Sequence, residues 1–194
     1  MKILLAGVAS LLFSVPGFAT TVSQSQDITQ SAQTFTMGFI GLPANTGSFG
    51  TFTLKASGDF SDNFGTSEGF SLDFDGLGSL FINESGVLSN SVSGLSLLSF
   101  SSVNIVDFYD ETITATFSLG SSLLSSMLAD NQAVFNIQNA SQTDAYYVQA
   151  YPGTDPDYVS MSLQYNVAAV PEPATTAMLM AGLGILGMMV RRRT

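Results

Sequence analysis

The sequence contains no cysteine, no histidine and no tryptophan. Without cysteine the chain forms no disulfide, so its fold must rest on packing or on bound metal. Without histidine or cysteine it also lacks the side chains of most nucleophile–base arrangements and of the usual zinc and copper sites. Paired carboxylates are then the only credible acid–base chemistry that remains.

Positive charge is nearly absent between the two ends of the chain. Lys55 is the only basic residue there, because Lys2 and three arginines lie at the termini. Fourteen acidic residues accompany it, so the segment between the ends carries a net charge of −13. This acidity argues against nucleic acid or anionic lipid as a partner.

The N-terminus has the layout of a secretory signal peptide over residues 1–19. Lys2 supplies a positive charge, residues 3–15 are apolar, and Gly17-Phe18-Ala19 places small residues at the end. This pattern predicts export, with cleavage after Ala19.

The C-terminus combines three elements in a fixed order. They are a linker at 168–173 that contains Pro171, Glu172 and Pro173, an apolar run at 174–190, and a basic end at 191–194 that contains Arg191, Arg192 and Arg193. As a helix the apolar run spans about 25 Å, the short end of the range for a transmembrane helix. The arginines favour a cytoplasmic C-terminus, which leaves residues 20–167 outside the cytoplasm. A permanent anchor that nothing cuts is the alternative.

This three-part tail resembles the PEP-CTERM protein-sorting signal of Gram-negative bacteria. In that family a membrane-embedded exosortase recognises the Pro-Glu-Pro element, and the tail is thought to be removed as the protein passes outward. The resemblance implies a transient inner-membrane precursor and a mature form at the cell surface or outside the cell. It also implies a bacterium that makes extracellular polysaccharide, with a role for the protein in biofilm or floc formation.

A second short pattern lies within the exported part. Phe60, Asp62 and Phe64 resemble the motif of the FxDxF subset of PEP-CTERM proteins. As physical chemistry, the two phenylalanines would pin a loop to the core while Asp62 accepts backbone amides in an Asx-turn.

Period-two alternation of apolar and polar residues recurs through residues 20–167. The expected strands centre on residues 35–39, 52–56, 70–74, 80–82, 113–119, 135–137, 146–148 and 159–167. An Asp75-Gly76 turn separates the third from the fourth. The pattern predicts an all-β domain, an antiparallel β-sandwich or jelly-roll-like fold with one short helix.

Three segments depart from simple alternation. Residues 103–108 are mostly apolar and are expected to form a strand buried on both faces. Residues 122–130 place leucines and methionine at helical spacing behind Ser122, a candidate N-cap, and predict the short helix. Residues 20–32 are polar and are expected to form an arm or an edge strand.

Four carboxylates, those of Asp59, Asp62, Asp73 and Asp75, lie within 17 residues of the chain. If the segment folds back on itself, these hard oxygen ligands suit calcium. The alternative is a solvated acidic rim around a hairpin. The same carboxylates are the only candidates for the pair that a glycosidase needs, about 5–10 Å apart.

The sequence therefore predicts an exported, non-catalytic component of the cell surface or extracellular matrix, sorted by an exosortase. The first alternative is a carbohydrate-binding or adhesive module, stabilised by calcium, that binds exopolysaccharide or surface glycans. A secreted glycosidase-like enzyme is the third reading. No cofactor is expected apart from the calcium ion.

Overall fold

The structure, a computed structural model, describes residues 18–29, 32–58, 60, 68–106, 110–139 and 157–167. These residues form two five-stranded antiparallel sheets and one short helix. Sheet A has, in spatial order, β1 (Phe18–Asp27), β10 (Tyr158–Val167), β3 (Asn45–Gly58), β8 (Asp110–Gly120) and β7 (Leu95–Val106). Sheet B has, in spatial order, β2 (Thr34–Ile40), β9 (Gln132–Asn139), β4 (Phe70–Phe74), β5 (Ser79–Asn83) and β6 (Gly86–Asn90).

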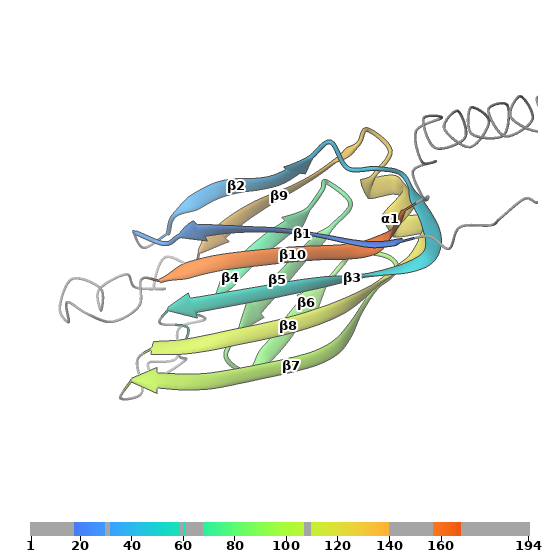
Figure 1. Cartoon of the computed structure of the whole chain (residues 1–194). Helices are drawn as coiled ribbons and strands as arrows, with labels where there is room; N and C mark the ends of the chain where they lie inside the picture. The colour runs from blue at the N-terminus through green and yellow to red at the C-terminus, as the bar shows by residue number, and fades with distance from the viewer. Residues whose placement is uncertain are drawn as a thin grey trace, which may run out of the picture. The chain divides into compact units, whose positions relative to one another are not determined.

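The chain alternates between the two sheets as it proceeds. Strands β1 to β4 lie in sheets A, B, A and B in turn, and β8, β9 and β10 alternate in the same way (Figure 1). This alternation is the arrangement of a jelly roll, in which hairpin-like pairs wrap around one core. The structure thus confirms the predicted all-β, antiparallel sandwich.

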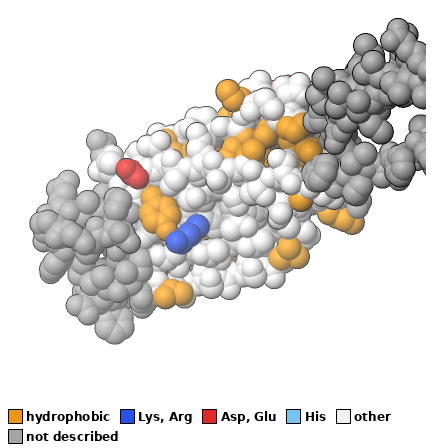
Figure 2. All heavy atoms as spheres, in the orientation of Figure 1, with side chains coloured by type: hydrophobic (Ala, Val, Ile, Leu, Met, Phe, Trp, Pro, Cys, Tyr) orange, Lys and Arg blue, Asp and Glu red, His pale blue; other side chains and the backbone are white. Residues whose placement is uncertain are grey.

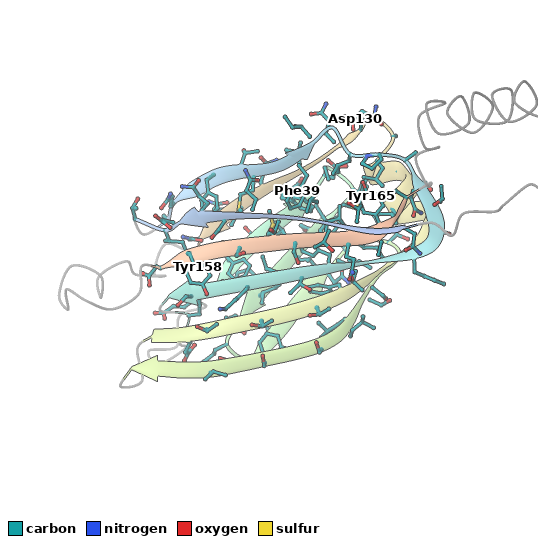
Figure 3. The ribbon with its side chains drawn as sticks, viewed as in Figure 1. Phe39, Asp130, Tyr158 and Tyr165 are labelled. Atoms are coloured by element: carbon teal, nitrogen blue, oxygen red, sulfur yellow. The ribbon has the colours of Figure 1, made fainter. Side chains whose placement is uncertain are left out.

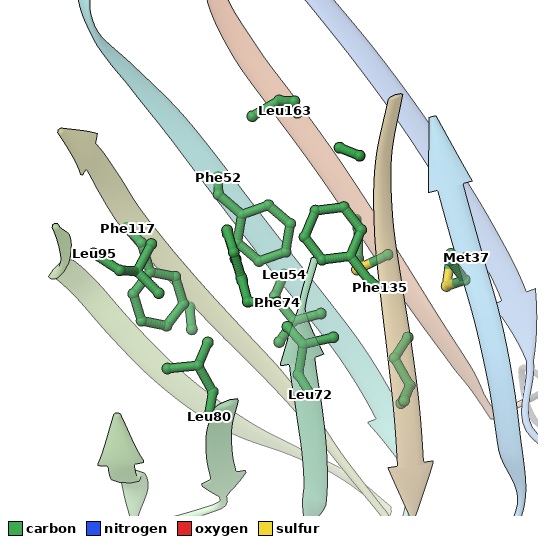
Figure 4. Close-up of a cluster of buried hydrophobic side chains, with 14 of the residues drawn as sticks. Met37, Phe52, Leu54, Leu72, Phe74, Leu80, Leu95, Phe117, Phe135 and Leu163 are labelled. Atoms are coloured by element: carbon green, nitrogen blue, oxygen red, sulfur yellow. The ribbon is translucent and has the colours of Figure 1, made fainter. Parts of the chain in front are cut away.

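The core between the sheets is built around Phe52 of β3. Its ring stacks on Phe135 of β9 with centroids 5.1 Å apart, and it meets Phe74 of β4 edge-on at 5.0 Å. Phe117 of β8 lies 6.3 Å away in the same sheet as Phe52 (Figure 4). All four rings are fully buried. Offset and edge-to-face pairs of this kind add about 0.5–1.5 kcal/mol each beyond the burial of area.

The edge strand β7 corrects one prediction. Residues 103–108 were expected to be buried on both faces, but Val103 is 59% exposed on the outer side of sheet A. Among the described strands, β7 pairs only with β8, so it forms an edge of sheet A. The outer face of the strand is exposed at Val103. Residues 107–109 lie outside the described part of the chain.

The short helix α1 (Ser121–Met127) confirms the predicted element but not its start. Gly120 is the N-cap and no side chain caps the helix, so the expected role of Ser122 was wrong. Leu123, Leu124 and Met127 are buried against the core, as their helical spacing predicted.

The ends of the chain remain predictions. Residues 1–17 of the expected signal peptide and residues 168–194 lie outside the described part of the chain, as does the strand expected at 146–148. Within the described residues, no helix is long and apolar enough to cross a bilayer. The segment expected to be an arm or an edge strand is the edge strand β1, in which Phe18 pairs with Val167.

We expect Phe52→Ala to lower the free energy of unfolding by about 3–5 kcal/mol, because it leaves a cavity at the contact between the sheets. Phe49→Ala is the matched control, since Phe49 lies on the same strand and is 66% exposed. That change should stay within about 0.5 kcal/mol. Denaturant unfolding of both variants measures the difference, and equal losses would contradict the central role of Phe52.

Candidate functional site

Of the four carboxylates predicted to bind calcium, the structure describes two. Asp73 lies in β4, and Asp75 is the first residue of the turn to β5. Asp75 and Gly76 both have positive φ, 57° and 68°, and the N–H of Leu77 donates to the carbonyl of Phe74 at 2.9 Å. This is the type I′ hairpin turn that an Asp-Gly pair favours. The predicted turn is confirmed, while Asp59 and Asp62 lie outside the described residues.

Both described carboxylates accept backbone hydrogen bonds. The N–H of Gly76 donates to Oδ1 of Asp73 at 2.9 Å, which closes the turn on itself. The N–H of Val134 donates to Oδ1 of Asp75 at 2.9 Å, which ties the turn to the neighbouring strand β9. The sequence pattern did not indicate this second contact, because it depends on the pairing of β4 with β9.

A third carboxylate raises the local negative charge. Asp130, labelled in Figure 3, lies in the connection between α1 and β9. Partial burial raises the pKa of Asp75, the hydrogen bond from Val134 opposes that rise, and the charges of Asp130 and Asp73 add to it. Asp75 is therefore a carboxylate held in an environment that disfavours its charge.

The described residues do not include a group of three or more acidic, histidine or cysteine side chains placed to hold a metal ion. Asp73 and Asp75 can offer their remaining oxygens, but the predicted site also needs Asp59 and Asp62. The calcium site therefore stays a prediction.

The first residue of the FxDxF pattern lies in the core. Phe60 is fully buried and meets Phe70 of β4 edge-on, with ring centroids 5.6 Å apart. A Cβ on Gly58 would lie 3.3 Å from its ring, so glycine leaves room for Phe60 there. Phe60 thus packs into the core of the sandwich, while the pinning of a loop by both phenylalanines stays a prediction. Asp62 and Phe64 lie outside the described residues.

The sequence pattern did not predict that three acidic residues are buried. Glu68, Glu111 and Asp157 are only 8%, 2% and 2% exposed. Glu111 lies two residues before the buried Ile113, and Asp157 lies two residues before the buried Val159. Extending the period-two pattern by one step would have found both, but carboxylates were assumed to face solvent.

A shallow hollow of about 240 Å³ lies beside the predicted signal cleavage site. Ala19, Phe49 and Gln164 line it together with Tyr165. The Tyr165 hydroxyl, labelled in Figure 3, donates to the carbonyl of Pro43 at 3.0 Å, and burial raises its pKa. No carboxylate lines the hollow, so it does not supply the pair that glycoside hydrolysis needs. Ala19 pairs with Asn166, so the predicted cut falls near the start of β1.

Comparison with known proteins identifies the C-terminal segment. A family model of the PEP-CTERM protein-sorting motif matches residues 169–193. No curated protein matches the chain. Among solved structures, the P-domain of the Macrobrachium rosenbergii nodavirus is similar at 11% identity over 78% of this chain and 98% of that one, with a TM-score of 0.27. A likeness at that level carries no argument.

We expect Asp75→Asn to raise stability at neutral pH by about 0.5 kcal/mol. The change removes a partly buried charge and its repulsion from Asp130 and Asp73, and it keeps the acceptor for Val134. The wild-type carboxyl has a pKa raised above its usual 3.8 in the folded protein. Its contribution to stability is therefore fully present below that usual value and falls as pH rises through the raised pKa. Melting curves should show the advantage of the variant at pH 7 and its disappearance toward pH 3.8.

Asp27→Asn is the matched control for this test, because Asp27 is an exposed aspartate on β1. Its effect at pH 7 should be clearly smaller than that of Asp75→Asn, because a surface substitution away from such a charge cluster changes stability little. A loss of stability at neutral pH in Asp75→Asn would contradict the repulsion argument.

We also expect calcium to raise the melting temperature if the four predicted carboxylates converge. A bound ion stabilises by about 2.7 kcal/mol at a hundredfold excess over Kd, and extracellular sites require calcium at about 0.1–1 mM or more. Asp73→Asn and Asp75→Asn should remove the shift between EDTA and calcium, whereas Asp27→Asn should keep it. Magnesium should do less, because it demands stricter octahedral geometry. Equal melting temperatures in EDTA and in calcium would contradict the calcium site and leave these aspartates with a structural role in the turn only.

Proposed function

Because the chain carries a PEP-CTERM protein-sorting motif, which indicates an exported protein that an exosortase sorts, we propose that it is a non-catalytic component of the cell surface or extracellular matrix. The motif at residues 169–193 is the observation that carries this proposal. A role in the matrix of a biofilm or exopolysaccharide goes beyond the motif. The composition of the β-domain and the outer face of its sheet A support that role.

The β-domain is complete before the motif begins. Residues 17–168 form one compact unit, and every core residue in the described part of the chain lies between Ile28 and Tyr165. Removal of the tail at Pro171-Glu172-Pro173 would therefore leave in the mature product all the buried residues that the structure describes. A fragment of residues 20–167 retains the same core and serves as the mature domain in solution experiments.

The lack of histidine and cysteine in the sequence, together with the contacts of Asp73 and Asp75, supports a non-catalytic role. The sequence has neither histidine nor cysteine, and the two described candidate carboxylates accept backbone amides in and beside a hairpin turn. A secreted glycosidase would need a pair of carboxylates at a ligand-accessible place, and the hollow beside β1 has none. A binding or adhesive module remains the second candidate, which the outer face of sheet A favours.

The proposed route begins with a precursor held in the inner membrane by residues 174–190, with Arg191 to Arg193 in the cytoplasm. The exosortase then acts at or next to Pro171-Glu172-Pro173, and the mature protein reaches the cell surface or the medium. Both steps rest on the layout of the sequence at the two ends.

We expect the mature protein from its natural host to lack both ends, because the Pro-Glu-Pro element lies where the apolar run meets the outer aqueous side. Intact-mass spectrometry of the surface and extracellular fractions measures this directly. Pro171→Ala with Pro173→Ala should leave the precursor in the membrane fraction. Pro43→Ala, a proline change within the exported domain, should be processed normally.

A mature form that still carries Arg191 to Arg193 would contradict processing of the tail. A processed protein found only in the periplasm would contradict the surface or matrix role.

A further inference from the structure

We propose that the outer face of sheet A binds an extended, electrically neutral polysaccharide. This inference deepens the proposed function, since an exported matrix component would meet such polymers. It rests on a regular array of hydroxyl groups that strand pairing assembles from residues far apart in the sequence. We call this array the hydroxyl face.

The hydroxyl face has a central row that crosses all five strands of sheet A. From β1 to β7 the row consists of Ser23, Ser162, Thr53, Thr116 and Ser99. Residues that lie opposite each other in antiparallel strands point to the same side of the sheet. With strands about 4.8 Å apart, the row extends about 19 Å.

Two parallel rows flank the central one, about 6.8 Å away along the strands. One consists of Thr21, Gln164, Thr51, Ser118 and Ser96. The other consists of Ser25, Ser160, Lys55, Thr114 and Ser101. Thirteen of the fifteen positions in the three rows therefore carry a hydroxyl.

All of these side chains are at least partly exposed. Figure 2 looks onto this side of the domain, whose middle is mostly white, the colour of the backbone and of side chains that are neither hydrophobic nor charged. Lys55 is the only basic residue in the described part of the chain and is the blue group in that view. The face is thus close to neutral in a segment whose net charge is −13.

The neutrality of the face selects the class of ligand. A polyanionic chain would be repelled by the acidic remainder of the domain, and the single lysine does not offset that charge. A neutral polymer avoids this repulsion. It also avoids the large cost of removing water from ionised groups.

Hydroxyl groups suit a polymer that itself presents many hydroxyls. Each serine or threonine can both donate and accept, so the face can match either role at each sugar position. The hydroxyls also bind one another only weakly. Thr53 and Thr116 are 3.4 Å apart at their Oγ1 atoms, and the Ser118 hydroxyl donates to the Ser96 carbonyl at 3.5 Å. These distances are well above the usual value of about 2.7–2.8 Å for a hydrogen bond between oxygen atoms. Replacing such weak bonds by hydrogen bonds to a ligand therefore costs little free energy.

The face is held rigid by the core beneath it. Phe52 and Leu54, which alternate with Thr51 and Thr53 on β3, are buried against sheet B. Short side chains on a fixed sheet lose little conformational entropy on binding. Many weak contacts along one polymer chain then add to a useful affinity.

Tyr158 supplies an aromatic surface at one end of the array (Figure 3). It lies two residues before Ser160 on β10, and the Nζ of Lys55 is 5.4 Å from its ring centroid. Aromatic rings of this kind combine an apolar surface with a polar tip, which suits the faces of sugar rings. Tyr158 therefore marks one end of the proposed binding track.

The outer face of sheet B lacks this regularity. Val134 of β9 and Phe81 of β5 lie on it beside polar residues, and Asp73 adds charge. Thr34 and Thr36 of β2 are exposed there and provide threonine positions for a control; the Thr36 hydroxyl donates to Oδ1 of Asn136 at 2.7 Å.

The test measures binding of the 20–167 fragment to insoluble cellulose, chitin and curdlan, three neutral polysaccharides, by depletion from solution. We expect saturable binding to at least one of them and none to an alginate gel, which is anionic. Thr53→Val with Thr116→Val removes two hydroxyls from the central row and should weaken the apparent Kd about tenfold. Thr34→Val with Thr36→Val adds the same apolar surface to sheet B and should leave Kd unchanged.

Melting curves of both double variants show that the fold persists, because valine favours strands at least as well as threonine. Failure to bind any of the three polysaccharides overturns the proposal, as does equal weakening in the two double variants. Neither result affects processing of the tail or the location of the mature protein. Conversely, a fragment that binds while the natural protein remains an unprocessed membrane precursor refutes the proposed function alone.

Discussion

The contact between Phe52 of one sheet and the rings of Phe74 and Phe135 of the other is the interaction on which the rest of this structure depends. No disulfide joins the sheets, so burial of apolar and aromatic area must hold them together. Because strand side chains alternate, fixing Phe52 inward also fixes Thr51 and Thr53 outward. The core contact therefore determines which residues the outer face presents, and a register slip of one residue would exchange the two sets.

The sorting signal and the folded domain occupy separate parts of the chain. Sorting is encoded in the motif at residues 169–193, and the β-domain ends at Val167 before that motif begins. The acidic residues of the domain and its outer hydroxyl groups therefore lie apart in the sequence from the basic and apolar residues of the tail.

Much of the fold could be predicted from alternation alone. Strands β2, β3, β4, β8, β9 and β10 have apolar residues at every second position, and that is the signal of a half-buried strand. Strand β6 and the first part of β7 were missed, because there serines and exposed leucines such as Leu88 and Leu98 blur the pattern. The Asp-Gly turn after β4 was predictable, because its chemistry is local.

The features that depend on strand order could not be predicted in the same way. The bond from Val134 to Asp75 and the hydroxyl rows need the pairing of segments more than fifty residues apart. The individual threonines and serines were visible in the sequence as common polar residues. Their alignment into rows appears only once β10 is known to lie between β1 and β3.

The position of β10 between β1 and β3 also determines when sheet A can form during folding. The first strand of sheet A pairs along its whole length with the last, Phe18 with Val167 and Asp27 with Tyr158. Among the described strands β1 pairs only with β10, so the N-terminal strand cannot join sheet A until the C-terminal one is present. Pairings this distant in sequence form late and slowly. A chain that lacks β10 would therefore hold an unfinished sheet A, in which β1 and β3 have open edges that are a ready target for proteolysis.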